Sequence, residues 1–89
     1  MWIEVFYFGR LREISGQRKE KLNMPDGDHL SDVIRVLTEK YGNEFKVRIT
    51  SRDNCSVLIN GRHDGTIDGG RSGLNDGDQV VFLPVNMGG

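Results

Sequence analysis

The sequence predicts one α+β domain, in which a mixed, four- to five-stranded sheet carries one main helix packed across one face. Three observations lead to this fold class. Residues 2–8 and 79–84 are strongly apolar and of β type, one amphipathic pattern covers residues 30–41, and turn signals divide most of the remainder. The most apolar strands belong in the centre of a small sheet. Because the connection between these two strands contains the helix, we expect them to pair in parallel.

The first half of the chain predicts a hairpin followed by the helix. Residues 2–8 are rich in aromatic and β-branched types, and Gly9 ends this strand. Residues 10–16 predict a short helical turn, and residues 17–24 predict a half-exposed strand that pairs back on the first. Residues 25–28, Pro-Asp-Gly-Asp, form a turn signal. The helix then presents one apolar face and is expected to begin with Ser31 as its N-cap and to stop at Gly42.

The second half predicts short strands and turns. Residues 44–54 have no clean period, but the alternation of Phe45, Val47 and Ile49 predicts a short strand. Residues 56–59 predict another strand, closed by the hairpin dipeptide Asn60-Gly61. Residues 64–75 predict an irregular glycine-rich loop and residues 76–78 a tight turn. The last strand ends at Pro84, which has no N–H to donate.

Strand alternation divides the two central strands between two faces. Ile3, Val5, Val80 and Phe82 are expected to face the helix. On the same register, the opposite face is expected to present Phe6, Val81 and Leu83. Nothing in this chain is left to cover that second face, and an open apolar face usually indicates a partner protein.

Composition excludes several classes of function. The chain has 89 residues, and its 12 Lys and Arg nearly cancel its 13 Asp and Glu, so neither a nucleic acid nor an anionic membrane is expected as partner. The single Cys55 excludes an internal disulfide framework and a cysteine-based zinc cluster, and a reduced cytoplasmic setting fits. His29 and His63 are far apart, so no metal site is expected. No signal peptide and no membrane-spanning run is apparent.

The remaining candidate for chemistry is the glycine pair Gly88-Gly89. Glycines without a Cβ can enter a narrow slot, and the reactive group would be the α-carboxylate of Gly89. A carboxylate is a poor electrophile and must be activated, usually as an acyl adenylate. This chain is expected to bind no cofactor, so a partner enzyme would supply ATP and magnesium. We therefore expect a docking domain over residues 1–84 and a slim, flexible tail over residues 85–89.

The chain resembles the β-grasp sulfur carriers, most closely the small subunit of molybdopterin synthase. The resemblance covers essentially the whole sequence and rests on an aromatic first strand, a Pro-Asp-Gly turn before the helix, a terminal Gly-Gly and four further segments: Phe8-Gly9-Arg10-Leu11-Arg12-Glu13, Val57-Leu58-Ile59-Asn60-Gly61, Asp76-Gly77-Asp78-Gln79-Val80 and Phe82-Leu83-Pro84. It implies a ubiquitin-like fold. Residues 64–75 depart from the family pattern, because they contain adjacent glycines and more polar residues.

The resemblance also implies a reaction cycle and partners. A ubiquitin-activating-type adenylating enzyme would form the acyl adenylate of Gly89, and a sulfur donor would convert it to a thiocarboxylate. The tail, with Gly88 giving access, would then enter the large subunit of molybdopterin synthase and donate sulfur to the pterin precursor. The chain would be the small subunit of a synthase rather than a stand-alone enzyme. Its partner-binding residues would be Phe82, Leu83 and Pro84, with Val81 and Phe6 on the open face.

Three alternatives stay open at this point. A similar tail and fold also serve ubiquitin-like modifiers, in which Gly89 would form isopeptide bonds with lysines. The thiamine pathway uses related sulfur carriers, although these are typically shorter around Arg10-Leu11-Arg12-Glu13. In a non-reactive β-grasp adaptor, the two glycines would simply be a frayed end.

Overall fold

The computed structural model describes residues 1–50, 55–63 and 73–84. Its elements follow in the order β1 (Trp2–Tyr7), α1 (Arg10–Ser15), β2 (Lys19–Asn23), α2 (Leu30–Tyr41), α3 (Asn43–Thr50), β3 (Cys55–Ile59), β4 (Arg62–His63) and β5 (Gln79–Pro84). The expected first hairpin, main helix and final strand are therefore confirmed.

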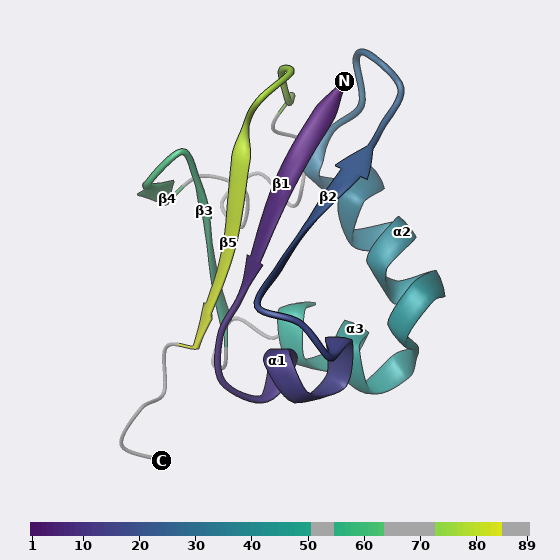
Figure 1. Cartoon of the computed structure of the whole chain (residues 1–89), viewed down its shortest axis with the longest axis vertical. Coiled ribbons are helices and arrows are strands. Elements are labelled where there is room, and N and C mark those ends of the chain that lie inside the picture. Colours follow the sequence, from purple (N-terminus) through teal and green to yellow (C-terminus); the bar gives the residue numbers. More distant parts are fainter. Residues whose placement is uncertain (51–54, 64–72, 85–89) are drawn as a thin grey trace.

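The five strands form one mixed sheet in the order β2-β1-β5-β3-β4. β1 and β5 pair in parallel, as predicted, whereas the β1–β2, β3–β5 and β3–β4 pairs are antiparallel. All three helices lie on the same side of this sheet (Figure 1). The last strand thus runs through the middle of the sheet, between β1 and β3.

The core lies between the sheet and the helices. Along β1 and β5, the side chains of Ile3, Val5, Tyr7, Val80 and Phe82 are fully buried. They meet apolar residues of α2 and α3, namely Leu30, Val33, Leu37, Phe45 and Ile49. Burying a large apolar side chain contributes about 1.5–3 kcal/mol, so this layer supplies much of the stability of so small a domain.

The region after the main helix differs from the sequence prediction. Residues 43–50 form the helix α3, so the strand predicted from the alternation of Phe45, Val47 and Ile49 was wrong. Phe45 and Ile49 are buried and stand four residues apart, whereas Val47 is 55% exposed. An i, i+4 ion pair between Glu44 and Arg48 (3.6 Å) lies on the solvent side of the helix. Residues 51–54, which the prediction also included, lie outside the described residues.

The start of α2 is also two positions away from the prediction. The helix begins at Leu30, and the N-cap is His29 in an extended conformation, so Ser31 lies in the first turn. The Asp32 carboxylate accepts a hydrogen bond from the His29 N–H (2.9 Å) and completes the cap. That hydrogen bond holds the pKa of Asp32 below its ordinary value. The predicted stop at Gly42 is confirmed, with φ of 92°.

A tight turn and a tethered loop end follow β3. Asn60 and Gly61 have φ of 52° and 84°, as the predicted tight hairpin between β3 and β4 requires. Of the predicted loop, residues 64–72 lie outside the described residues. Its last part is tied down, because the Leu74 side chain is buried and its N–H donates to the Asp28 carbonyl (3.1 Å). Among the described residues, no helix is long and apolar enough to cross a membrane.

Candidate functional site

The side of the sheet away from the helices carries a continuous apolar row. Phe6 of β1 lies opposite Val81 of β5, and Val81 lies opposite Leu58 of β3. Leu83, two residues further along β5, extends the row toward the end of that strand. All four side chains are partly exposed. We call Phe6, Leu58, Val81 and Leu83 the outer face.

The outer face confirms the orientation predicted for Phe6, Val81 and Leu83, and it adds Leu58. Leu58 was not singled out from the sequence, although its alternation with the buried Val57 and Ile59 carries the signal. Three adjacent strands therefore contribute apolar side chains to one surface. The arrangement fits an apolar partner surface.

Phe82 is not part of this surface. Its side chain has no exposed area, and its ring packs edge-on against Phe45, with centroids 6.3 Å apart. The prediction that Phe82 contacts a partner therefore needs correction, because strand alternation turns it toward the helices while Val81 and Leu83 point away. Pro84, the last residue of β5, pairs with Cys55 across the sheet.

Two cations lie over aromatic rings at the end of β1, and one of these rings, Phe6, belongs to the outer face. The Lys19 ammonium is 6.0 Å from the centre of the Phe6 ring and 3.8 Å from the Glu4 carboxylate. The Arg12 guanidinium lies 4.8 Å from the centre of the Phe8 ring, and its Nε donates to the Tyr7 carbonyl (2.9 Å). The outer face therefore has a positive charge, Lys19, beside its one aromatic ring.

The predicted reactive end follows directly on this surface in the sequence. β5 ends at Pro84, and residues 85–89 come next. Gly88 and Gly89 lie outside the described residues, so their roles stay predictions. What the structure does establish is that the strand before them is central in the sheet and flanked on both sides. The end of β5, which residues 85–89 follow in the sequence, is thus held by a strand on each side.

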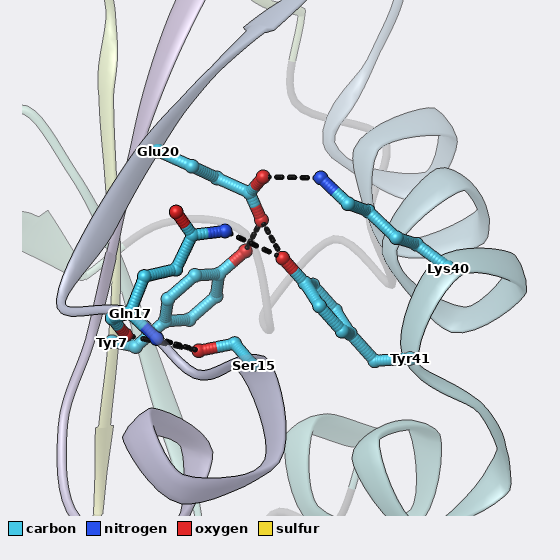
Figure 2. Close-up of polar contacts among 6 residues, drawn as sticks. All are labelled: Tyr7, Ser15, Gln17, Glu20, Lys40 and Tyr41. Atoms are coloured by element: carbon cyan, nitrogen blue, oxygen red, sulfur yellow. Dashed lines mark hydrogen bonds and ion pairs between the residues drawn. The ribbon is translucent and has the colours of Figure 1, made fainter.

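A partly buried polar cluster, which sequence reasoning missed, braces this end of the domain from the helix side (Figure 2). The hydroxyls of Tyr7 and Tyr41 both donate to Oε1 of Glu20, and Lys40 donates to its Oε2 (2.6 Å). Gln17 adds a hydrogen bond to the Tyr41 hydroxyl (2.8 Å). Only 8% of the Glu20 side chain is exposed, although it comes from the strand at the edge of the sheet. The cluster joins β1, β2 and α2.

Burial and hydrogen bonding act in opposite directions on the Glu20 carboxylate. Burial alone would raise its pKa, but the hydrogen bonds from Lys40, Tyr41 and Tyr7 outweigh it, and the pKa lies below its ordinary value. Burial, together with the hydrogen bond to Glu20, raises the pKa of Tyr7 well above its usual range. The cluster is thus one carboxylate with neutral phenols and an ammonium. The Lys40 ammonium balances the charge of the Glu20 carboxylate, and the cluster holds β1, β2 and α2 together.

Other chemistry-bearing residues offer little. Cys55 is buried, and burial raises the pKa of its thiol to about 11, which leaves it a poor nucleophile. Within residues 1–50, 55–63 and 73–84, no group of His, Cys, Asp or Glu side chains is arranged to hold a metal ion. The outer face and the end of β5 remain the best candidate site.

Comparison with known proteins settles the family. The model of the ThiS family matches residues 5–89, nearly the whole chain. The chain belongs to the ThiS family. Its fold is the ubiquitin-like β-grasp, and the family comprises sulfur carriers and protein modifiers.

Three comparisons show which named proteins this ThiS-family chain is similar to. It is 32% identical to Small archaeal modifier protein 3 of Haloferax volcanii and 28% identical to the Molybdopterin synthase sulfur carrier subunit of Chlamydomonas reinhardtii, each over the full length of both chains. The solution structure of the HVO 2177 protein of Haloferax volcanii superposes with a TM-score of 0.82 at 31% identity. That match covers 100% of this chain and 87% of that one. One relative is thus named as a modifier and one as a sulfur carrier.

Proposed function

We propose that this protein is a sulfur carrier whose reactive atom belongs to the α-carboxylate of Gly89. An adenylating enzyme joins the carboxylate oxygen to the α-phosphate of ATP and releases pyrophosphate. A sulfur donor supplies sulfur at the oxidation level of hydrosulfide, which attacks the acyl carbon, and AMP leaves with the carboxylate oxygen. The product is a Gly89 thiocarboxylate. ATP and magnesium belong to the adenylating enzyme in this scheme.

The observation that carries the proposal is the family match, which runs through residue 89 and so includes both glycines. The residues before Pro84 also support the proposal, because β5 is a central strand that contributes to the apolar outer face. A partner enzyme could bind the outer face and take the narrow tail into its active site. Activation of the terminal carboxylate requires both a docking surface and a narrow tail.

The outer face is the proposed docking surface for the partners. Phe6, Val81 and Leu83 would contact the partner directly, with Leu58 beside them and Pro84 where the tail begins. Residues 85–89 can span at most about 17 Å when fully extended. A partner seated on the outer face must therefore hold its reactive centre within about that distance of the end of β5.

For the receiver of the sulfur we propose the molybdopterin precursor, bound in the large subunit of a molybdopterin synthase. The full-length relative from Chlamydomonas reinhardtii is by name a sulfur carrier subunit of that synthase. As its small subunit, this chain would supply the sulfur atom, and the large subunit would supply the site of transfer.

A second candidate function is covalent protein modification through Gly89. The Haloferax volcanii relative, a modifier by name, is 32% identical, against 28% for the synthase subunit. If the chain is a modifier, cells expressing an epitope-tagged form will show higher-mass conjugates that disappear when Gly89 is deleted. A carrier without this second role will give no conjugates in the same blot.

The steric requirement on the tail provides a direct test. We expect Gly88→Val, or one residue added after Gly89, to abolish ATP–pyrophosphate exchange by a matching adenylating enzyme, because a side chain blocks the narrow slot. The melting temperature should not change, since the last residues of a domain seldom contribute to its core. Leu83→Ala is the matched control for docking and should weaken exchange without abolishing it. Undiminished exchange by Gly88→Val would refute the proposed role of the tail.

A further inference from the structure

The edge strand β2 offers a second surface, which adjoins the outer face at Lys19. β2 is the first strand of the sheet, so only β1 pairs with it among the described residues. It lies on the opposite side of β1 from β5, the strand that carries two of the outer-face residues (Figure 1). A partner bonded to the β2 edge would therefore leave the outer-face residues of β3 and β5 free, while Lys19 lies where the two surfaces meet.

The hydrogen-bonding pattern between β1 and β2 shows which backbone groups of β2 form no hydrogen bond with β1. The Arg18 carbonyl accepts from Tyr7 N–H (2.8 Å), and Met24 N–H donates to the Met1 carbonyl (2.8 Å). In an antiparallel pair, residues that bond the neighbouring strand alternate with residues that do not. Residues 18, 20, 22 and 24 therefore bond toward β1. The N–H and C=O groups of Lys19, Lys21 and Asn23 point outward, at the free edge.

Both lysines of this edge also present their side chains on one face. The Lys19 side chain is 63% exposed and lies 3.8 Å from Glu4, and Lys21 is exposed and forms no ion pair within the described ranges. A hollow of about 420 Å³, lined by Trp2, Glu4, Lys21 and Gly77, adjoins Lys21. Trp2 is 54% exposed there. The strip thus combines outward backbone groups, two cations and an apolar wall.

We propose that the edge of β2 binds an extended acidic segment of a partner protein by strand addition. Carboxylates two residues apart in that segment would face Lys19 and Lys21, and the backbone groups of Lys19, Lys21 and Asn23 would continue the sheet. The segment's alternate residues would point toward α2. There Val36 is partly buried and lies one turn before Lys40, the residue that reaches Glu20. The expected pattern is therefore alternating acidic and apolar residues.

The charge pattern argues against other occupants. If two copies paired antiparallel about Glu20, Lys19 of one copy would face Lys21 of the other twice over, and like charges directly opposite one another are destabilising. A nucleic acid could meet the two ammonium groups, but it cannot continue a β-ladder of alternating donors and acceptors. An acidic polypeptide satisfies both the charges and the backbone.

The test uses the full chain and a synthetic hexapeptide that alternates Glu and Val. Binding should change the fluorescence of Trp2, the single tryptophan of the chain. Amide hydrogen exchange should slow at Lys19, Lys21 and Asn23, but not at Glu20 and Leu22, whose N–H groups already bond β1. This alternating protection distinguishes strand addition from binding elsewhere. Uniform or absent protection would overturn the proposal.

Two variants separate charge from backbone. Replacing both lysines by glutamine (K19Q/K21Q) should weaken the peptide roughly fivefold to tenfold and remove most of the salt dependence. Lys21→Pro removes an outward N–H without breaking a bond to β1, so it should prevent binding while the fold persists. Equal binding of a hexapeptide that alternates Lys and Val would contradict the charge argument. Self-association through β2 without peptide would identify a second copy as the occupant instead.

Discussion

At the residue scale, neighbouring positions of β5 have opposite tasks. Phe82 is fully buried beneath Phe45, whereas Val81 and Leu83 are partly exposed on the outer face. A change of one position along the strand therefore moves a side chain from the core to the proposed docking surface. Stability and partner binding should separate cleanly between adjacent residues.

Substitutions at these two positions test that separation. Phe82→Ala should lower the free energy of unfolding by about 3–5 kcal/mol, because it removes a ring from a packed core. Leu83→Ala should cost far less stability and should weaken binding to a partner instead. Urea unfolding and an affinity measurement on both variants decide the matter. Equal losses of stability would show that Leu83 is a core residue.

Glu20 is the second residue whose environment has a measurable consequence. Its folded-state pKa lies below the ordinary value, so its cluster stabilises the fold fully above about pH 4.3. That stabilisation is lost as the pH falls from there through the folded-state pKa. Glu20→Gln should cost about 1–3 kcal/mol at pH 7. In urea unfolding over a pH series, the difference from wild type should shrink below about pH 4; a constant difference would mean that charge is unimportant in the cluster.

At the element scale, α3 shows how local pattern can mislead. Phe45, Val47 and Ile49 alternate, and the sequence prediction took this as a strand. Two of the three positions are also spaced four apart, and in the helix these two alone are buried, against the core. Tertiary packing favours the helix over a strand here, because the Phe45 ring contacts Tyr7, Tyr41 and Phe82 of three other elements. Tyr41 is near Phe45 in the sequence, but Tyr7 and Phe82 are far from it, so no local window contains them.

The helical assignment of residues 43–50 leads to a paired prediction. Phe45→Ala should destabilise the fold by about 3–5 kcal/mol. Val47→Ala should change the free energy of unfolding by less than about 0.5 kcal/mol, because the Val47 side chain is exposed on the helix and contributes little to the core. Thermal unfolding of both variants, followed by circular dichroism, measures the contrast. A large loss for Val47→Ala would contradict the helical register.

At the scale of the whole molecule, the sequence was informative wherever the signal was local or set by topology. The two apolar strands, the helix between them and the Asn60-Gly61 hairpin were predicted, and so was the parallel pairing of β1 with β5. The candidate site was predicted through strand alternation, which identified three of the four outer-face residues. The Glu20 cluster was not predictable, because it depends on contacts among β1, β2 and α2. Nothing in the short sequence around Glu20 signals such contacts.

The whole domain can be described as a rigid holder for its carboxyl end. The central position of β5 fixes where residues 85–89 begin, the helices and the Glu20 cluster brace the sheet from behind, and the outer face is left open. Membership of the ThiS family connects this architecture with sulfur carriers and modifiers. On this account, the chain supplies the reacting group and its partners supply the active sites.

The most direct test is the mass of the intact protein after incubation with a matching adenylating enzyme, ATP and a sulfur source. We predict a gain equal to the replacement of one oxygen by one sulfur, located at Gly89 in the carboxyl-terminal fragment. The gain should be absent without ATP and in a chain lacking Gly89. No gain under conditions in which a known carrier is converted, or sulfur located at Cys55 instead, would contradict the account.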